Sequence, residues 1–228
     1  AKNVGQSQIL EKRAQSITDG IWQHGVVAHK NYGRVFAYEV DGYGSQILMD
    51  DANVPSLLAL PIMGFLERTD PVYQNTRKML LNKAGNPYYL EGRAFHGIGG
   101  PHVGLEHAWP MSLLLQAMTS DDDKEIMGCV NLVLFASGLG LVHESINVNQ
   151  VHDYTSKLSG IRMSDTNADV SASGSWFACK SISGKVFTCQ TLLIEIGANS
   201  VFAQTILDLA KRKTHLIFGA GTEPYIVE

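Results

Sequence analysis

Helical periodicity that recurs along the chain and is broken by loops is the feature that most constrains its fold. Leu10, Ala14, Ile17 and Ile21 follow the spacing of one helix face, which predicts an amphipathic helix over residues 8 to 24 with that face packed inward. Further helices are expected at 54 to 66, 71 to 82, 106 to 119, 122 to 136 and 199 to 212. A short β-hairpin is expected from 35 to 40 and 45 to 49, around Asp41-Gly42-Tyr43-Gly44. The pattern therefore predicts an all-α fold that carries one short hairpin.

Composition and charge exclude several classes of function. The chain has 228 residues, is 45% hydrophobic and carries a net charge of -4, which suits a folded domain with a substantial core. It has no basic stripe of the kind that a phosphate backbone requires, so no nucleic-acid partner is expected. No apolar run approaches the roughly eighteen residues of a membrane span. Cys129, Cys179 and Cys189 are too few and too irregularly spaced for a disulfide framework or a zinc site.

Polar side chains gather just after the predicted hairpin. Asp50, Asp51 and Asn53 precede a predicted helix, where carboxylates can either cap backbone amides or bind hydroxyl groups. A plain N-cap needs only one such residue. The cluster therefore indicates a ligand-binding role beside the structural one.

Two later segments also carry groups suited to sugar chemistry. The loop from 86 to 109 combines glycines, which allow close backbone approach, with tyrosines, His102 and Trp109, whose faces and polar edges suit a sugar ring. The alternative is an ordinary solvent loop with incidental aromatics. His143-Glu144-Ser145 follows Gly138 and Gly140, and a carboxylate there could deprotonate a water for attack on a glycosidic carbon. Taken alone, Glu144 could equally be a solvated surface residue.

Several short motifs, taken together and in order, resemble glycoside hydrolase family 125. They are Asp50-Asp51-Ala52-Asn53-Val54-Pro55-Ser56-Leu57-Leu58, Tyr73-Gln74-Asn75-Thr76-Arg77, Asn86-Pro87-Tyr88-Tyr89, Gly97-Ile98-Gly99-Gly100-Pro101-His102, Trp109-Pro110-Met111-Ser112 and His143-Glu144-Ser145. The resemblance covers about residues 35 to 155 and resumes at 198.

The resemblance implies a fold, a reaction and roles for particular residues. The family consists of metal-independent, inverting exo-α-mannosidases that act mainly on α-1,6 linkages and fold as an (α/α)6 toroid, so neither a metal nor a cofactor is expected. By resemblance Glu144 is the general base, and Asp50, Asp51, Asn53, His102, Trp109 and His143 bind the substrate, a mannose-containing oligosaccharide.

The resemblance places the general acid well upstream of the Asp50 motif, outside these residues. Residues 1 to 228 are therefore expected to be the C-terminal part of a single catalytic domain, inactive by itself. Two alternatives remain open. One is a non-catalytic carbohydrate-binding pseudoenzyme, and the other is a different toroid enzyme such as a sugar epimerase.

Two equally long segments, 156 to 174 and 179 to 197, interrupt the family's run of residues after Tyr154-Thr155. Both can be encoded with an intron donor at their start, AGT AAG for Ser156-Lys157 and TGT AAG for Cys179-Lys180, and both end in a glycine that can complete an acceptor. Excision restores Thr-Arg-Ser-Trp-Phe-Ala-Trp-Ala-Asn-Ser. We therefore expect two translated introns, that is, non-native insertions that form poorly packed, exposed loops, although genuine loop insertions are the alternative.

Overall fold

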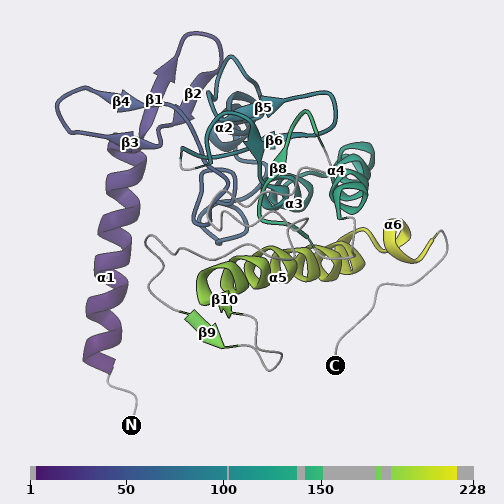
Figure 1. Ribbon diagram of the computed structural model, residues 1–228. Coiled ribbons are helices and arrows are strands. Elements are labelled where there is room, and N and C mark those ends of the chain that lie inside the picture. The colour runs from purple at the N-terminus through teal and green to yellow at the C-terminus, as the bar shows by residue number, and fades with distance from the viewer. Residues whose placement is uncertain (1–3, 102, 138–141, 151–177, 181–185, 220–228) are drawn as a thin grey trace.

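The computed structural model describes residues 4–101, 103–137, 142–150, 178–180 and 186–219. Helices account for most of its regular structure (Figure 1). They are α1 (Val4–Gly20), the π-helix η1 (Ile21–Gly25), α2 (Pro71–Leu80), α3 (Pro110–Met118), α4 (Asp123–Ala136), α5 (Cys189–Arg212) and α6 (Thr214–Phe218). The expected mostly helical fold is confirmed.

The strands form short antiparallel pairs rather than a larger sheet. The pairs are β1 (Val26–His29) with β2 (Gly33–Phe36), β3 (Glu39–Val40) with β4 (Gln46–Ile47), β5 (Tyr89–Glu91) with β6 (His96–Ile98), β7 (His107–Ala108) with β8 (Ile146–Asn147), and β9 (Ala178–Lys180) with β10 (Val186–Thr188). The predicted hairpin is the β3–β4 pair, with Glu39 opposite Ile47. The expectation of a single hairpin is wrong. Residues 35 and 36 belong to β2 and pair with β1, and every described strand holds only two to four residues, too few for an alternating pattern to stand out in the sequence.

Aspartate caps define the starts of α2 and α4. The Asp70 carboxylate accepts hydrogen bonds from the amides of Val72 (2.8 Å) and Tyr73 (3.0 Å), and Pro71 occupies the first turn of the helix. Asp122 accepts from the amide of Lys124 at 2.9 Å. Both helices thus begin where the sequence predicts, whereas α3 begins at Pro110 because residues 107 and 108 pair as β7 instead.

The helix expected over residues 54 to 66 does not form. This stretch consists of turns, with Gly64 at a φ of +73°. Pro61 has no amide hydrogen to donate, and the amides of Leu57 and Leu58 donate to the side chain of Asp50. These local bonds replace the helical ladder, so the apolar spacing there reflects a folded loop.

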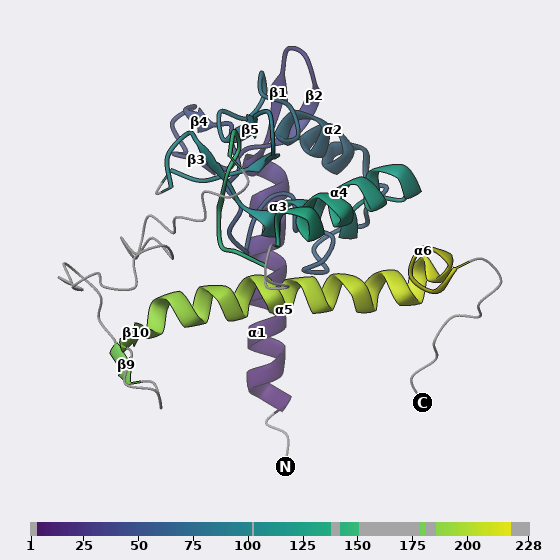
Figure 2. The same ribbon diagram turned by 45° about the vertical axis from the view of Figure 1, so that its right-hand side comes forward.

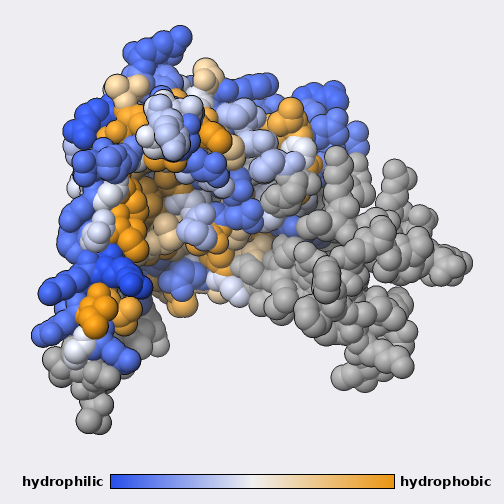
Figure 3. All heavy atoms as spheres, turned by 90° about the vertical axis from the view of Figure 1, so that its left-hand side faces the viewer, coloured by the Kyte–Doolittle hydropathy of each residue, from blue (hydrophilic) through white to orange (hydrophobic). Residues whose placement is uncertain are grey.

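The inward-facing stripe expected on the first helix is also wrong. Leu10 and Ile17 are 65% and 59% exposed, and α1 extends away from the body in Figure 1. In Figure 2, where α5 crosses in front of α1, the N-terminal part of α1 projects below the other helices. On the face shown in Figure 3, apolar side chains are visible on α1 and on the neighbouring part of the body. The amphipathic pattern is present, but the described residues provide nothing that covers this stripe.

The main core lies where α3, α4 and α5 meet. Its buried side chains include Leu113, Leu114, Ile126, Val133, Ile146 and Leu209. A second cluster packs α2 against β2 and the β5–β6 pair, with Val35, Met79, Leu80 and Ile98 at its centre. The two cores fix the loops between these elements, which carry the predicted site residues.

The last long helix begins at Cys189, ten residues earlier than residue 199. The expectation that 179 to 197 forms only loops is therefore wrong for its described residues. Residues 179–180 and 186–188 belong to β9 and β10, and 189 to 197 continue the downstream helix with residues such as Gln190, Leu192 and Glu195 that favour helix. Residues 156 to 174 lie outside the described residues, and the packing of side chains 179 to 197 is not described. That both segments are non-native insertions stays a prediction. Among the helices of the described residues, none is long and apolar enough to cross a membrane.

Candidate active site

Glu144 lies on a short segment that hydrogen bonds hold in place on both sides. Downstream, β8 pairs with β7, so that Ile146 lies opposite Ala108 and Asn147 opposite His107. Upstream, the backbone of Val142 exchanges two hydrogen bonds with the side chain of Asn199 on α5. Glu144 itself is only 7% exposed. Its burial shows that it is not the freely solvated residue that a lone surface glutamate would be.

Trp109 lies next to the Glu144 segment through the same strand pair. It directly follows Ala108 of β7, and its amide donates to the carbonyl of Ile98 at 3.0 Å. Its side chain is buried in a small cluster with Ala52 and Val103, against which Met111 packs. This cluster links the aromatic loop to the aspartate segment.

Asp50 is fully buried and organises the loop that follows it. Its two carboxylate oxygens accept hydrogen bonds from the amides of Leu57 (3.0 Å) and Leu58 (2.9 Å). The side chain of Asn86 bonds both the amide and the carbonyl of Asp50. Burial raises the pKa of Asp50 to about 7, although the backbone hydrogen bonds act in the opposite direction. In this arrangement Asp50 shapes the loop from inside.

Asp51 and Asn53 lie on the outer side of the same loop and are partly exposed. The carboxylate of Asp51 accepts from the amide of Asn53 at 2.7 Å, which forms a tight turn. Between them, the amide of Ala52 donates to the carbonyl of Gly99 at 2.9 Å. Gly99 must be a glycine because a Cβ there would lie 2.4 Å from the carbonyl oxygen of His107.

Backbone contacts thus join segments that are far apart in sequence. The loop of Asp51 and Asn53 contacts Gly99, the strand ending at Ile98 contacts Trp109, and Ala108 pairs with Ile146, two residues after Glu144. His143 is partly buried beside Glu144. His102 lies outside the described residues. That all these side chains face one concave surface stays a prediction.

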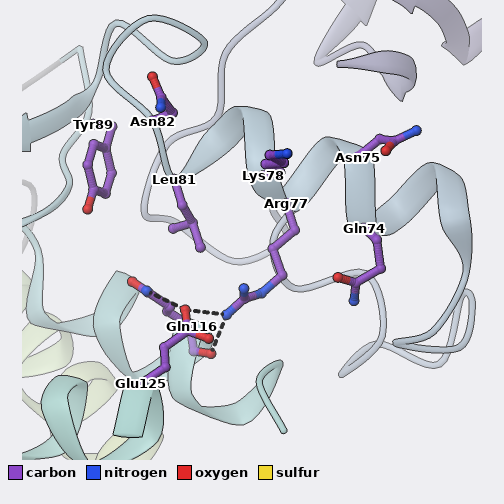
Figure 4. A pocket seen from close by; sticks show the side chains of 9 residues that line it. All are labelled: Gln74, Asn75, Arg77, Lys78, Leu81, Asn82, Tyr89, Gln116 and Glu125. Carbon is purple, nitrogen blue, oxygen red and sulfur yellow. Dashed lines mark hydrogen bonds and ion pairs between the residues drawn. The ribbon is translucent and has the colours of Figure 1, made fainter. Parts of the chain in front are cut away.

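A hollow of about 560 Å³ lies elsewhere, between α2, the β5 region and the start of α4 (Figure 4). Its lining includes Gln74, Arg77 and Tyr89, which belong to two of the motifs noted in the sequence, and none of the predicted site residues. Arg77 forms an ion pair with Glu125 at 2.8 Å, and Gln116 donates to the same carboxylate. Burial pushes the pKa of Glu125 upward, but hydrogen bonds from Ser120, Gln116 and Arg77 hold it below its ordinary value. Apart from these two motifs, no signal in the sequence points to this cluster.

Potential metal ligands are scattered over the described residues. Nowhere in that part of the chain do three His, Cys, Asp or Glu side chains gather as a metal site requires. The candidate site is therefore built from a carboxylate, an aromatic side chain and polar loop residues.

Comparison with known proteins identifies the class to which this chain belongs. Residues 2–160 match the family model described as metal-independent alpha-mannosidase, glycoside hydrolase family 125. The chain belongs to this family. The match ends inside the first of the two interrupting segments.

Two relatives show how much of a family member the chain represents. It is 49% identical over 205 residues to the meiotically up-regulated gene 157 protein of Schizosaccharomyces pombe, a match that covers 90% of this chain and 33% of the yeast protein. A solved Streptococcus pneumoniae metal-independent alpha mannosidase, in a non-productive complex with alpha-1,6-mannobiose, matches with a TM-score of 0.65 and 33% identity. That match covers 69% of this chain and 37% of the bacterial one. The chain thus spans about a third of the length of the relatives it matches.

Proposed function

We propose that this chain forms part of the catalytic domain of an inverting exo-α-mannosidase that hydrolyses α-1,6-linked mannosides, with Glu144 as its general base. One observation carries the proposal. In a chain of this family, strand β8 holds the Glu144 segment next to β7, the strand that leads into Trp109. The bacterial neighbour's complex with alpha-1,6-mannobiose supports the choice of substrate. The toroid belongs to the same proposal, with these helices as one part of the ring.

Inversion requires two carboxyl groups about 6.5 to 9.5 Å apart, one to protonate the leaving oxygen and one to activate water. Glu144 takes the second role: it removes a proton from a water as that water attacks the anomeric carbon. A second carboxyl group, supplied from upstream of the Asp50 motif, protonates the departing sugar oxygen. The 228 residues alone are accordingly proposed to be inactive.

The remaining predicted site residues, apart from Asp50, bind the terminal mannose. Asp51 and Asn53 lie on a partly exposed turn with groups that bond sugar hydroxyls. His102 and His143 are assigned to the same polar set from the sequence motifs. The indole of Trp109, which packs in a cluster with Val103, contacts the apolar part of the sugar ring. Asp50 contributes by holding the loop through Leu57 and Leu58.

The interrupting segments 156 to 174 and 179 to 197 form no part of the proposed enzyme. The end of the family match at residue 160 supports this for the first segment. Reverse transcription and sequencing of the mature transcript tests it directly. Retention of both segments in that transcript would refute the insertion hypothesis.

The activity is tested in an extended chain, made by joining the upstream part of the yeast relative to this sequence and removing both interrupting segments. We expect it to release mannose from α-1,6-mannobiose with inversion, without added metal, as followed by NMR of the anomeric proton. The 228-residue chain serves as the inactive comparison, because loss of acid catalysis alone costs roughly 10² to 10⁴ in rate.

Glu144→Gln in the extended chain should abolish turnover and preserve mannose binding, measured by calorimetry. Glu106→Gln is the matched control, since Glu106 is an exposed glutamate just before β7 whose backbone carbonyl bonds Val148. Full activity of Glu144→Gln would contradict the assignment of the base. Mannose binding without turnover in the extended chain itself would favour the pseudoenzyme.

A further inference from the structure

The side chain of Asn199 holds the backbone of Val142 at both of its polar groups. The Asn199 carboxamide oxygen accepts from the amide of Val142 at 3.1 Å, and its nitrogen donates to the Val142 carbonyl at 3.2 Å. A carboxamide satisfies both groups because it presents one acceptor and two donors side by side. Val142 is buried at 4% exposure, so the two bonds replace contacts with water.

The two hydrogen bonds between Asn199 and Val142, here called the Val142 clasp, lie two residues before Glu144. The β7–β8 pair begins two residues after Glu144, at Ile146. Glu144 therefore sits in the middle of a short span that is fixed at both ends. One end is held by a strand pair and the other by a side chain from α5, more than fifty residues away in sequence. Loss of the contacts at either end would allow the Glu144 carboxylate to move.

We infer that Asn199 is a positioning residue that fixes the Val142 backbone and so holds the Glu144 carboxylate where the attacking water binds. This inference rests on the proposed function, because it takes Glu144 to be the general base. Asn199 acts through the backbone and does not need to contact the sugar. A displacement of about 1 Å at a catalytic group can cost roughly 10²-fold in rate, which is why a remote clasp affects turnover.

The kinetic test uses Asn199→Ala in the extended chain, which removes both bonds to Val142. We expect kcat on α-1,6-mannobiose to fall roughly 10²-fold, with KM nearly unchanged, because the base moves while the sugar contacts stay. Gln204→Ala is the matched control: it removes an exposed amide from the same helix, and should leave kcat unchanged. If Asn199→Ala does not fold, Asn199→Asp replaces it, because the carboxylate keeps an acceptor for the Val142 amide.

A second measurement examines the clasp in the 228-residue chain itself. Hydrogen exchange at the Val142 amide, followed by mass spectrometry or NMR, should accelerate in Asn199→Ala and remain slow in Gln204→Ala. An unchanged Val142 exchange rate would show that Asn199 does not hold the Val142 backbone, and would overturn the inference whatever the activity of the extended chain.

The possible kinetic outcomes separate this inference from the proposed function. If Glu144→Gln is inactive and Asn199→Ala keeps full kcat, the inference is wrong and the function stands. A raised KM with unchanged kcat in Asn199→Ala would also overturn it, because Asn199 would then bind the sugar. If Glu144→Gln keeps full activity, the proposed function fails first.

Discussion

The guanidinium of Arg77 on α2 lies 2.8 Å from the carboxylate of Glu125 on α4 and also donates to the backbone carbonyl of Gln116 on α3. One side chain thus joins three helices, at a place where both charged groups are largely withdrawn from water. Removal of one charged partner leaves the other partly buried without an opposite charge, which is the costly way to break such a pair.

Arg77→Ala should therefore lower the free energy of unfolding by roughly 2 to 4 kcal/mol, measured by urea denaturation. Arg68→Ala is the matched control, because its ion pair with Asp121 is much more exposed and should contribute about 1 kcal/mol or less. Arg77→Lys should recover only part of the lost unfolding free energy, since an ammonium group cannot reproduce the several hydrogen bonds of the planar guanidinium. Equal costs for Arg77→Ala and Arg68→Ala would contradict the importance of burial here.

The buried Asp50 should make stability depend on pH. Its pKa is about 7 in the folded chain against an ordinary value of 3.8, so between these values the folded state holds a proton that the unfolded state has lost. This contribution to stability is fully present below about pH 4 and is lost as the pH rises toward 7. In Asp50→Asn this loss of stability with rising pH should disappear. The check is the slope of unfolding free energy against pH for the two proteins, since the substitution also shifts the baseline by altering the bonds from Leu57 and Leu58.

Two glycines should respond oppositely to alanine. A Cβ at Gly92 would lie 2.1 Å from the carbonyl oxygen of Val148, which already accepts from Ala94 and Phe95, so the backbone must move. Gly92→Ala should destabilise the chain by about 2 kcal/mol or more, as for other strongly overpacked sites. At Gly128, in the interior of α4, nothing beyond the adjacent residues and the helix's own backbone lies within 4 Å of the added carbon.

Gly128→Ala should therefore stabilise the chain by roughly 0.5 to 1 kcal/mol through helix propensity. Thermal melting of the two variants side by side provides the measurement. A destabilised Gly128→Ala would mean that α4 packs differently from the structure described.

Features encoded by neighbouring residues could be predicted from the sequence. The Asp70-Pro71 pair predicted the start of α2, and Asp122 that of α4, because capping depends on residues within one turn. The apolar spacing of 54 to 66 resembles that of a helix, while the hydrogen bonds that the amides of Leu57 and Leu58 donate to Asp50 leave no trace in the periodicity.

Long-range contacts account for the rest of what the sequence did not reveal. The Asn199 clasp on Val142 and the reach of Arg77 to Glu125 join residues with no local signal that connects them. For the candidate site, the motifs located the segments of Asp51, Trp109 and Glu144. Their adjacency depends on the β7–β8 pair and on the bond from Ala52 to Gly99, which only the structure supplies.

The projecting α1 also has a kinetic consequence. Lys12 and Arg13 are exposed on a helix whose apolar stripe lies open, so little tertiary packing opposes its local unfolding. Among the described residues, a protease with basic specificity should therefore cut first in this helix, while the body held by the α3, α4 and α5 core survives. The lifetime of α1 in a protease-rich environment would lengthen in any assembly that buries its stripe.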